Sequence, residues 1–183
     1  MLDNVKSKYI LKEIFDIIKN KRKLKIIKYN KKIKIKLDIN KGDFEKYIAL
    51  KEFNKKYDIN IEDIDLKVLM LNWRNIRNMD LKDLVIINFK KLEILDLSGN
   101  KISNINILEK VNFKELKKLN LSYTEVSDIE ILVKVNFNEL QKLDLSGNKI
   151  STLNSFEKVN FKELKEFNIS FTQISDINVL EKS

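Results

Sequence analysis

An eleven-residue segment recurs four times, at a constant interval, in the second half of this 183-residue chain. Every copy carries an apolar residue at its first, fourth, sixth and eleventh positions. A fixed period of this kind is typical of repeat architectures, in which each copy is one supersecondary unit that stacks on its neighbours. The period therefore predicts a solenoid with open surfaces. The four copies occupy residues 92–102, 116–126, 140–150 and 164–174.

The apolar positions follow the pattern L-x-x-L-x-L-x-x-N-x-L, which resembles the leucine-rich repeat; Asn100 and Asn148 supply its asparagine. The segments Ser127-Asp-Ile-x-x-Leu132 and Ser175-Asp-Ile-x-x-Leu180 are similar to those of internalins and of leucine-rich-repeat phosphatase regulators. This resemblance implies an α/β solenoid, a right-handed array with a parallel sheet on its concave side. Those families bind other proteins through the concave strand face, so the resemblance also implies a protein-interaction module.

Two further features define the array. A degenerate fifth copy precedes the others, so we expect five 24-residue turns over residues 66–183. Alternate copies also differ, because Ser-Gly-Asn-Lys-Ile follows the strand in two of them and Ser-(Tyr/Phe)-Thr follows it in the other two. The unit of duplication is therefore a pair of successive turns. In the fifth copy Val68, Leu71, Trp73 and Asn78 are aligned with Leu92, Leu95, Leu97 and Ile102.

Several residues have an expected structural role within each turn. Phenylalanines recur once in every turn and should stack as a buried column. Asn100 and Asn148 should bind backbone groups where the chain leaves the strand, with Thr124 and Thr172 replacing them in the alternate copies. A serine after each strand should precede a short capped helix. The phenylalanines are Phe89, Phe113, Phe137 and Phe161, and the serines are Ser103, Ser127, Ser151 and Ser175.

The N-terminal region, residues 1–65, has a different character. Residues 1–60 carry a net charge of +10, whereas residues 61–183 carry −1, and Lys19–Lys36 contains ten basic residues and no acidic one. Apolar residues at helical spacing predict helices here. We interpret the region first as a basic helical cap that covers the first repeat.

Two alternatives use the same residues. Tyr9 to Lys32 resembles an F-box, with Glu13, Ile14 and Phe15 in its first helix, which would imply a substrate receptor that binds a Skp-type adaptor of a cullin ubiquitin ligase. Otherwise the lysines of Lys19–Lys36 bind nucleic acid or another anionic surface. The candidate adaptor or anionic contacts are Ile14, Phe15, Lys21, Arg22, Lys23, Lys25, Lys28, Lys31 and Lys32.

Composition excludes several functions. The chain has no histidine and no cysteine, so it lacks an imidazole base, a thiol nucleophile and the usual ligands of zinc. We expect no enzymatic activity, no metal and no cofactor. No stretch has the length of a membrane span or the apolar core of a signal peptide, which favours the cytoplasm, with the nucleus as the second compartment. The 33 lysines, 26 isoleucines and 22 asparagines indicate an AT-rich genome.

We expect three interaction surfaces. The first is the concave face, where outward strand residues form two polar rows that bind the partner. The second is a pair of aromatic residues, Tyr123 and Phe171, at the positions that Gly99 and Gly147 hold in alternate copies; they either anchor a partner or pack on neighbouring turns. The third is the C-terminal repeat, whose apolar end should support weak self-association. The two rows are Asn72, Asp96, Asn120, Asp144 and Asn168, and Arg74, Ser98, Ser122, Ser146 and Ser170.

Overall fold

The computed structural model describes residues 30, 32, 35, 41–61, 65–72, 81–159 and 161–177. The chain divides into two compact units, Met1–Glu62 and Asp63–Ser183. In the first unit the described secondary structure includes helix α4 (Lys41–Tyr57), whose Phe53 and Tyr57 are buried and meet edge to face at 4.6 Å. Asp58 follows in the left-handed conformation, and the Ile59 N–H donates to the Asn54 carbonyl at 3.0 Å, which ends the helix in a Schellman motif.

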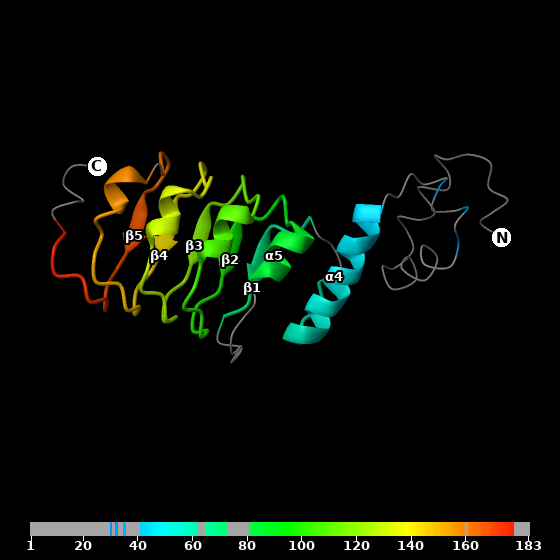
Figure 1. Ribbon diagram of the computed structural model, residues 1–183, viewed down its shortest axis with the longest axis horizontal. Helices are drawn as coiled ribbons and strands as arrows, with labels where there is room; N and C mark the ends of the chain where they lie inside the picture. Colours follow the sequence, from blue (N-terminus) through cyan, green and yellow to red (C-terminus); the bar gives the residue numbers. More distant parts are fainter. Residues whose placement is uncertain are drawn as a thin grey trace. The chain divides into compact units, whose positions relative to one another are not determined.

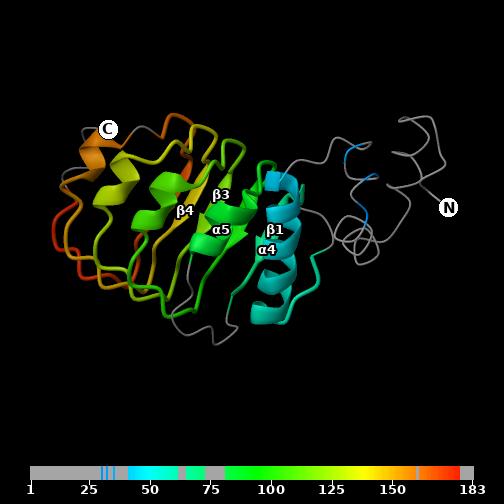
Figure 2. The ribbon, with the colours of Figure 1, turned by 45° about the vertical axis from the view of Figure 1, so that its right-hand side comes forward.

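The second unit is built on one parallel sheet of five strands in sequential order (Figure 1). Each strand pairs with the next, as the leucine-rich-repeat pattern predicted. Short helical segments connect the strands and form a separate layer beside the sheet (Figure 2). The strands are β1 (Val68–Met70), β2 (Ile94–Asp96), β3 (Lys118–Asn120), β4 (Lys142–Asp144) and β5 (Glu166–Asn168); the helical segments are α5 (Lys82–Ile87), η2 (Asn106–Lys110), η3 (Glu130–Val133) and η4 (Phe156–Lys158).

The core lies between these two layers. The middle residue of each strand points into it, and Leu95, Leu119 and Leu143 are fully buried and paired in register. The predicted phenylalanine column is confirmed at Phe113 and Phe137, whose buried rings stack with centroids 6.5 Å apart. Each turn thus covers apolar surface that a single turn would leave in water.

The alignment of the first copy was wrong by two positions. Val68 pairs with Ile94 and not with Leu92, so Leu69, and not Leu71, pairs with Leu95. Met70, and not Asn72, therefore stands in the row of Asp96. The difference arises because the connection from the first strand to Leu81 is two positions longer than the equivalent connection in the next copy.

The predicted serine caps are also wrong for the helical segments η2 to η4, which are 3₁₀ helices without a side-chain bond at the N-cap. The acceptor comes one residue after the serine. Asn104 Oδ1 accepts from the Asn106 N–H at 2.8 Å, and Asp128 Oδ1 accepts from the Glu130 N–H at 2.9 Å. An amide or carboxylate oxygen binds the N–H two residues on, as in an Asx turn.

The predicted role of the two asparagines is confirmed. Asn100 Nδ2 donates to the carbonyls of Leu71 and Leu97, at 2.7 and 2.9 Å. Asn148 Nδ2 donates to the carbonyls of Leu121 and Leu145, at 2.8 and 2.9 Å. Each buried side chain thus links its own turn to the preceding one.

Candidate binding face of the sheet

The first and third residues of every strand project from the face of the sheet opposite the core, called the open face below. Over β2 to β5 this face is hollowed into a groove of about 320 Å³. Two rows of side chains run along the open face, and their members on β2 to β5 border the groove. The first-position row is Val68, Ile94, Lys118, Lys142 and Glu166, and the third-position row is Met70, Asp96, Asn120, Asp144 and Asn168.

The third-position row contains four of the ten residues predicted to bind a partner, and these four side chains already make hydrogen bonds within the chain. Asp96 Oδ1 accepts from the backbone N–H of Ser98 at 2.9 Å and from its hydroxyl at 2.6 Å. Its Oδ2 accepts from Asn120 Nδ2 at 3.4 Å. Asp144 repeats this arrangement, and its Oδ2 accepts from Asn168 Nδ2 at 3.2 Å. The aspartates hold the turns that follow the strands as well as facing the groove.

The serine row differs from the predicted one. Ser98, Ser122 and Ser146 are buried, and of the four serines Ser170 alone is exposed. The reason is that each strand ends at its third residue, so the alternation of faces stops there. The serine then folds back, and its N–H donates to the aspartate or asparagine side chain two residues earlier. These serines shape the turn.

The first-position row was missed by sequence reasoning, although its residues recur two positions before the Asp/Asn row. Lys118 is exposed, and among the described residues no ion pair involves it. Lys142 pairs with Glu166. At the other end of the face, Val68 and Met70 are 46% and 56% exposed. The open face therefore changes from apolar at β1 to charged at β3 and β4.

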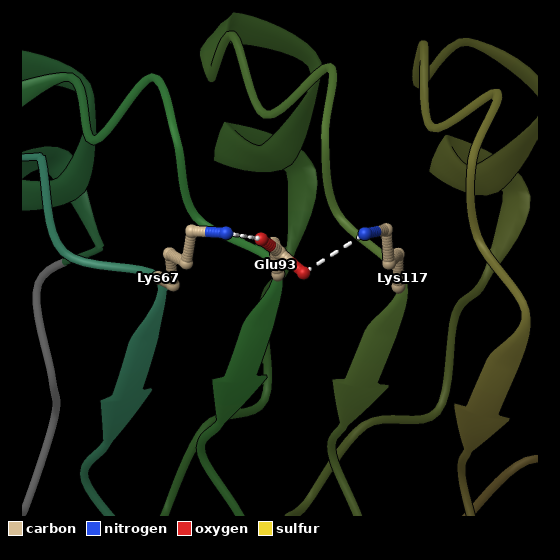
Figure 3. A network of polar contacts seen from close by, with 3 residues as sticks. All are labelled: Lys67, Glu93 and Lys117. Atoms are coloured by element: carbon tan, nitrogen blue, oxygen red, sulfur yellow. Dashed lines mark hydrogen bonds and ion pairs between the residues drawn. The ribbon is translucent and has the colours of Figure 1, made fainter.

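A three-residue ion-pair network spans the residues that precede β1, β2 and β3 (Figure 3). Lys67 Nζ lies 2.6 Å from Glu93 Oε1, and Lys117 Nζ lies 2.9 Å from Glu93 Oε2. The hydrogen bonds from Lys117 and Lys67 lower the pKa of Glu93 to about 2. The bond to Glu93 raises the pKa of Lys67. The network holds the Glu93 carboxylate between a lysine of the preceding turn and a lysine of the following turn.

Tyr123 and Phe171, the predicted aromatic anchors, occupy the same backbone conformation as the glycines of the other copies. Their φ angles are 51° and 57°, against 67° for Gly99 and Gly147. Their side chains are 51% and 81% exposed. The Tyr123 ring lies on Gly147, because a Cβ built there would come within 2.6 Å of Tyr123 Cδ1. Tyr123 therefore packs on the next turn, whereas Phe171 is largely in solvent.

Of the residues predicted to contact an adaptor or an anionic surface, only Lys32 lies among the residues that the structure describes. It is helical and exposed. In the described part of the chain, no group of three or more acidic side chains could hold a metal ion. Nor does any helix in that part have the length and apolar character to cross a membrane. The sites outside are Ile14, Phe15, Lys21, Arg22, Lys23, Lys25, Lys28, Lys31 and Arg74.

Comparison with known proteins identifies the repeats. The family model "Leucine Rich repeats (2 copies)" matches residues 90–134, 114–158 and 138–182. The chain belongs to the leucine-rich-repeat family. No curated protein sequence matches it.

Solved structures of internalins from Listeria monocytogenes are similar to this leucine-rich-repeat chain. One, internalin InlF, shares 25% identity with a TM-score of 0.53 over 75% of this chain. Another, internalin C2, shares 28% identity with a TM-score of 0.54 over 66% of it. The match spans 34% of the first internalin and 49% of the second. The resemblance to internalins expected from the Ser-Asp-Ile segments is thus confirmed.

Proposed function

We propose that this chain is a protein-interaction module that binds a partner polypeptide on the open face of its sheet. The observation that carries the proposal is the composition of that face. Exposed apolar side chains, Val68 and Met70, stand at one end of the first- and third-position rows, and Lys118 is exposed beside the groove without an ion pair among the described residues. Apolar contact area together with charged groups that select the partner is the usual composition of a specific interface.

The remaining polar groups support binding in a different way. Asp96 and Asp144 are held by their own turns, so a partner meets them in one fixed orientation. Fixed acceptors cost little entropy on binding. Because the same bonds stabilise the turns, replacing an aspartate would change both folding and binding. Lys118 is the better residue for a test.

The experiment is photo-cross-linking with the full chain in an extract of the source organism. In one variant a benzophenone amino acid replaces Lys118 on the open face. In the control variant it replaces Lys110, which is exposed at the end of η2. We expect a discrete cross-linked protein from position 118 only. Lys118→Glu should then weaken capture of that protein about tenfold with an unchanged melting temperature. Equal cross-linking from both positions, or capture indifferent to Lys118→Glu, would contradict the proposal.

A further inference from the structure

Neighbouring strands are joined on the open face by pairs of side chains in which a donor meets an acceptor. Between β4 and β5, Lys142 of the first-position row forms an ion pair with Glu166. In the third-position row of the same two strands, Asn168 Nδ2 donates to Asp144 Oδ2 at 3.2 Å. The third-position row between β2 and β3 is joined in the same way, by an asparagine that donates to an aspartate. These pairs are complementary in charge or in hydrogen bonding.

The junction between β3 and β4 sets like groups against each other in both rows. In the first-position row Lys118 lies opposite Lys142, so two ammonium groups are neighbours. In the third-position row Asn120 lies opposite Asp144. The amide nitrogen of Asn120 is directed away from β4 and donates to Asp96 on β2, so an amide oxygen and a carboxylate remain at the junction. Like charges directly opposite each other destabilise a sheet.

Both acceptors at this junction have room for a further donor. Asn120 Oδ1 accepts one bond, from the Ser122 N–H at 2.9 Å. The Asp144 carboxylate accepts three bonds, two of them from Ser146 and one from Asn168. An amide oxygen and a carboxylate can each accept more bonds than these. A donor from a partner can therefore bind here without displacing a bond that holds a turn.

The two lysines need an acceptor. Lys118 is exposed, and no ion pair among the described residues involves it. Glu166 neutralises Lys142 and leaves Lys118 uncompensated. A carboxylate brought to Lys118 by a partner would form an ion pair and would also remove the repulsion between the two lysines.

The two requirements are opposite in sign and lie on the same two strands. The first and third residues of a strand are about 7 Å apart, and neighbouring strands are about 5 Å apart. A partner of a single sign, such as a nucleic acid or a wholly basic segment, would be attracted by one row and repelled by the other. The charged residues that line the groove are Lys118 and Lys142 together with Asp96, Asp144 and Glu166.

We propose that the open face selects a partner segment that carries an acidic and a basic side chain within about three residues of each other, because an extended segment spans about 7 Å in two residues. The acidic side chain binds Lys118 on the side of Lys142. The ammonium or guanidinium group of the basic side chain donates to Asn120 Oδ1 and to the Asp144 carboxylate. This inference rests on the proposed function, since it names the chemistry of the polypeptide that binds this face.

The test is a selection of random short peptides, displayed on phage, against the full chain, with a parallel selection against its Lys118→Glu variant. We expect peptides that prefer the unmodified chain to contain an acidic and a basic residue at short spacing more often than the starting library. One such peptide is then synthesised, and its affinity is measured by fluorescence anisotropy. Neutral replacement of its acidic residue, or of its basic residue, should each weaken binding about tenfold.

Asp144→Asn and Asp96→Asn form a matched pair of variants of the full chain. Both aspartates accept from the serine two residues on and from an asparagine of the next strand. Asn120 shows that asparagine can hold such a turn. Asp144 borders the junction between β3 and β4, whereas Asp96 does not. The melting temperatures of the two variants separate an effect on folding from one on binding.

We expect Asp144→Asn to weaken the peptide about tenfold and to remove the further effect of replacing its basic residue, whereas Asp96→Asn should change its affinity less than about twofold. Selected peptides that depend on Lys118 but carry acidic residues alone, or that bind both variants equally, would overturn this inference and leave the proposed function intact. Absence of peptides that prefer the unmodified chain would also overturn it. The cross-link from position 118 then decides separately whether a partner polypeptide binds the open face.

Discussion

Replacing the two buried asparagines by alanine should have unequal costs, although they occupy equivalent positions. Asn148 donates to the Leu121 and Leu145 carbonyls and accepts from Thr124 Oγ1 and the Val126 N–H. Asn100 makes the same kind of donated bonds, but among the described residues its Oδ1 has no partner. The difference between the two replacements therefore measures what the acceptor side of the amide contributes.

The magnitude follows from the groups left behind. Asn148→Ala leaves the fully buried Val126 N–H without an acceptor, and an unsatisfied buried donor costs about 1–3 kcal/mol. The Thr124 hydroxyl has one hydrogen, which it can still donate to the Leu121 carbonyl. Asn100→Ala removes donors from two carbonyls and also removes a buried oxygen that has no partner among the residues that the structure describes. We expect Asn148→Ala to be more destabilising by about 2 kcal/mol.

Urea unfolding of both variants, followed by circular dichroism, measures this difference in the free energy of unfolding. The comparison requires that the two variants have the same dependence of that free energy on urea concentration. Thr124→Val, alone and combined with Asn148→Ala, completes a double-mutant cycle and isolates the hydroxyl–amide contact. Residues 122–126 and 170–174 are called threonine turns here, and residues 98–102 and 146–150 asparagine turns. Equal destabilisation by the two alanine replacements, within about 0.5 kcal/mol, would refute the conclusion that the threonine turn 122–126 recognises the amide oxygen of Asn148.

Three further predictions concern the ion-pair network, the turns and the core. The pKa of Glu93, about 2 in the folded chain against an ordinary 4.5, means that its carboxylate stabilises the fold above about pH 4.5. That contribution is lost as the pH falls towards 2, so Glu93→Gln should flatten the dependence of melting temperature on pH in this window, unlike the same change at an exposed glutamate. Gly147→Ala should cost about 1–2 kcal/mol in urea unfolding because of its left-handed conformation, and Tyr123→Ala in the same chain should recover the part due to the ring contact; no recovery would mean that backbone strain is the whole cost. Phe137→Ala should cost about 3–5 kcal/mol, whereas Phe171→Ala should stay within about 0.5 kcal/mol; comparable losses would contradict the assignment of Phe171 to the surface.

The register of β2 to β5 could be predicted because the apolar period leaves no choice of face. Leu119 and Leu143 lie between polar or charged neighbours, so one set of residues can enter the core. The first strand gives no such contrast. Val68, Leu69, Met70 and Leu71 are all apolar, so the apolar pattern fits two registers that differ by two positions and keep Leu71 inward. Pairing with β2 places Leu69 opposite Leu95, which the residues themselves could not indicate.

The open face could be predicted only in part. The recurring Asp/Asn row was visible from its period, but its engagement with the serines was not, because the strand's end determines where alternation stops. The first-position row escaped notice since its residues differ in character from turn to turn: Ile94 is apolar, Lys118 basic and Glu166 acidic. A face defined by geometry rather than by residue type is found only once the register is known.

The duplication of turns in pairs has a physical basis in the two contacts that alternate along the sheet. Between β2 and β3, and again between β4 and β5, an asparagine donates to an aspartate of the preceding strand. Between β3 and β4 the threonine turn binds the asparagine turn. Two threonine turns in succession would bring an aromatic ring where glycine is required, and an asparagine turn without a threonine turn before it would lack the hydroxyl donor. Asn100, whose oxygen has no partner among the described residues, is that second case. Duplication of a single turn would have broken both contacts, whereas duplication of a pair of turns preserves them.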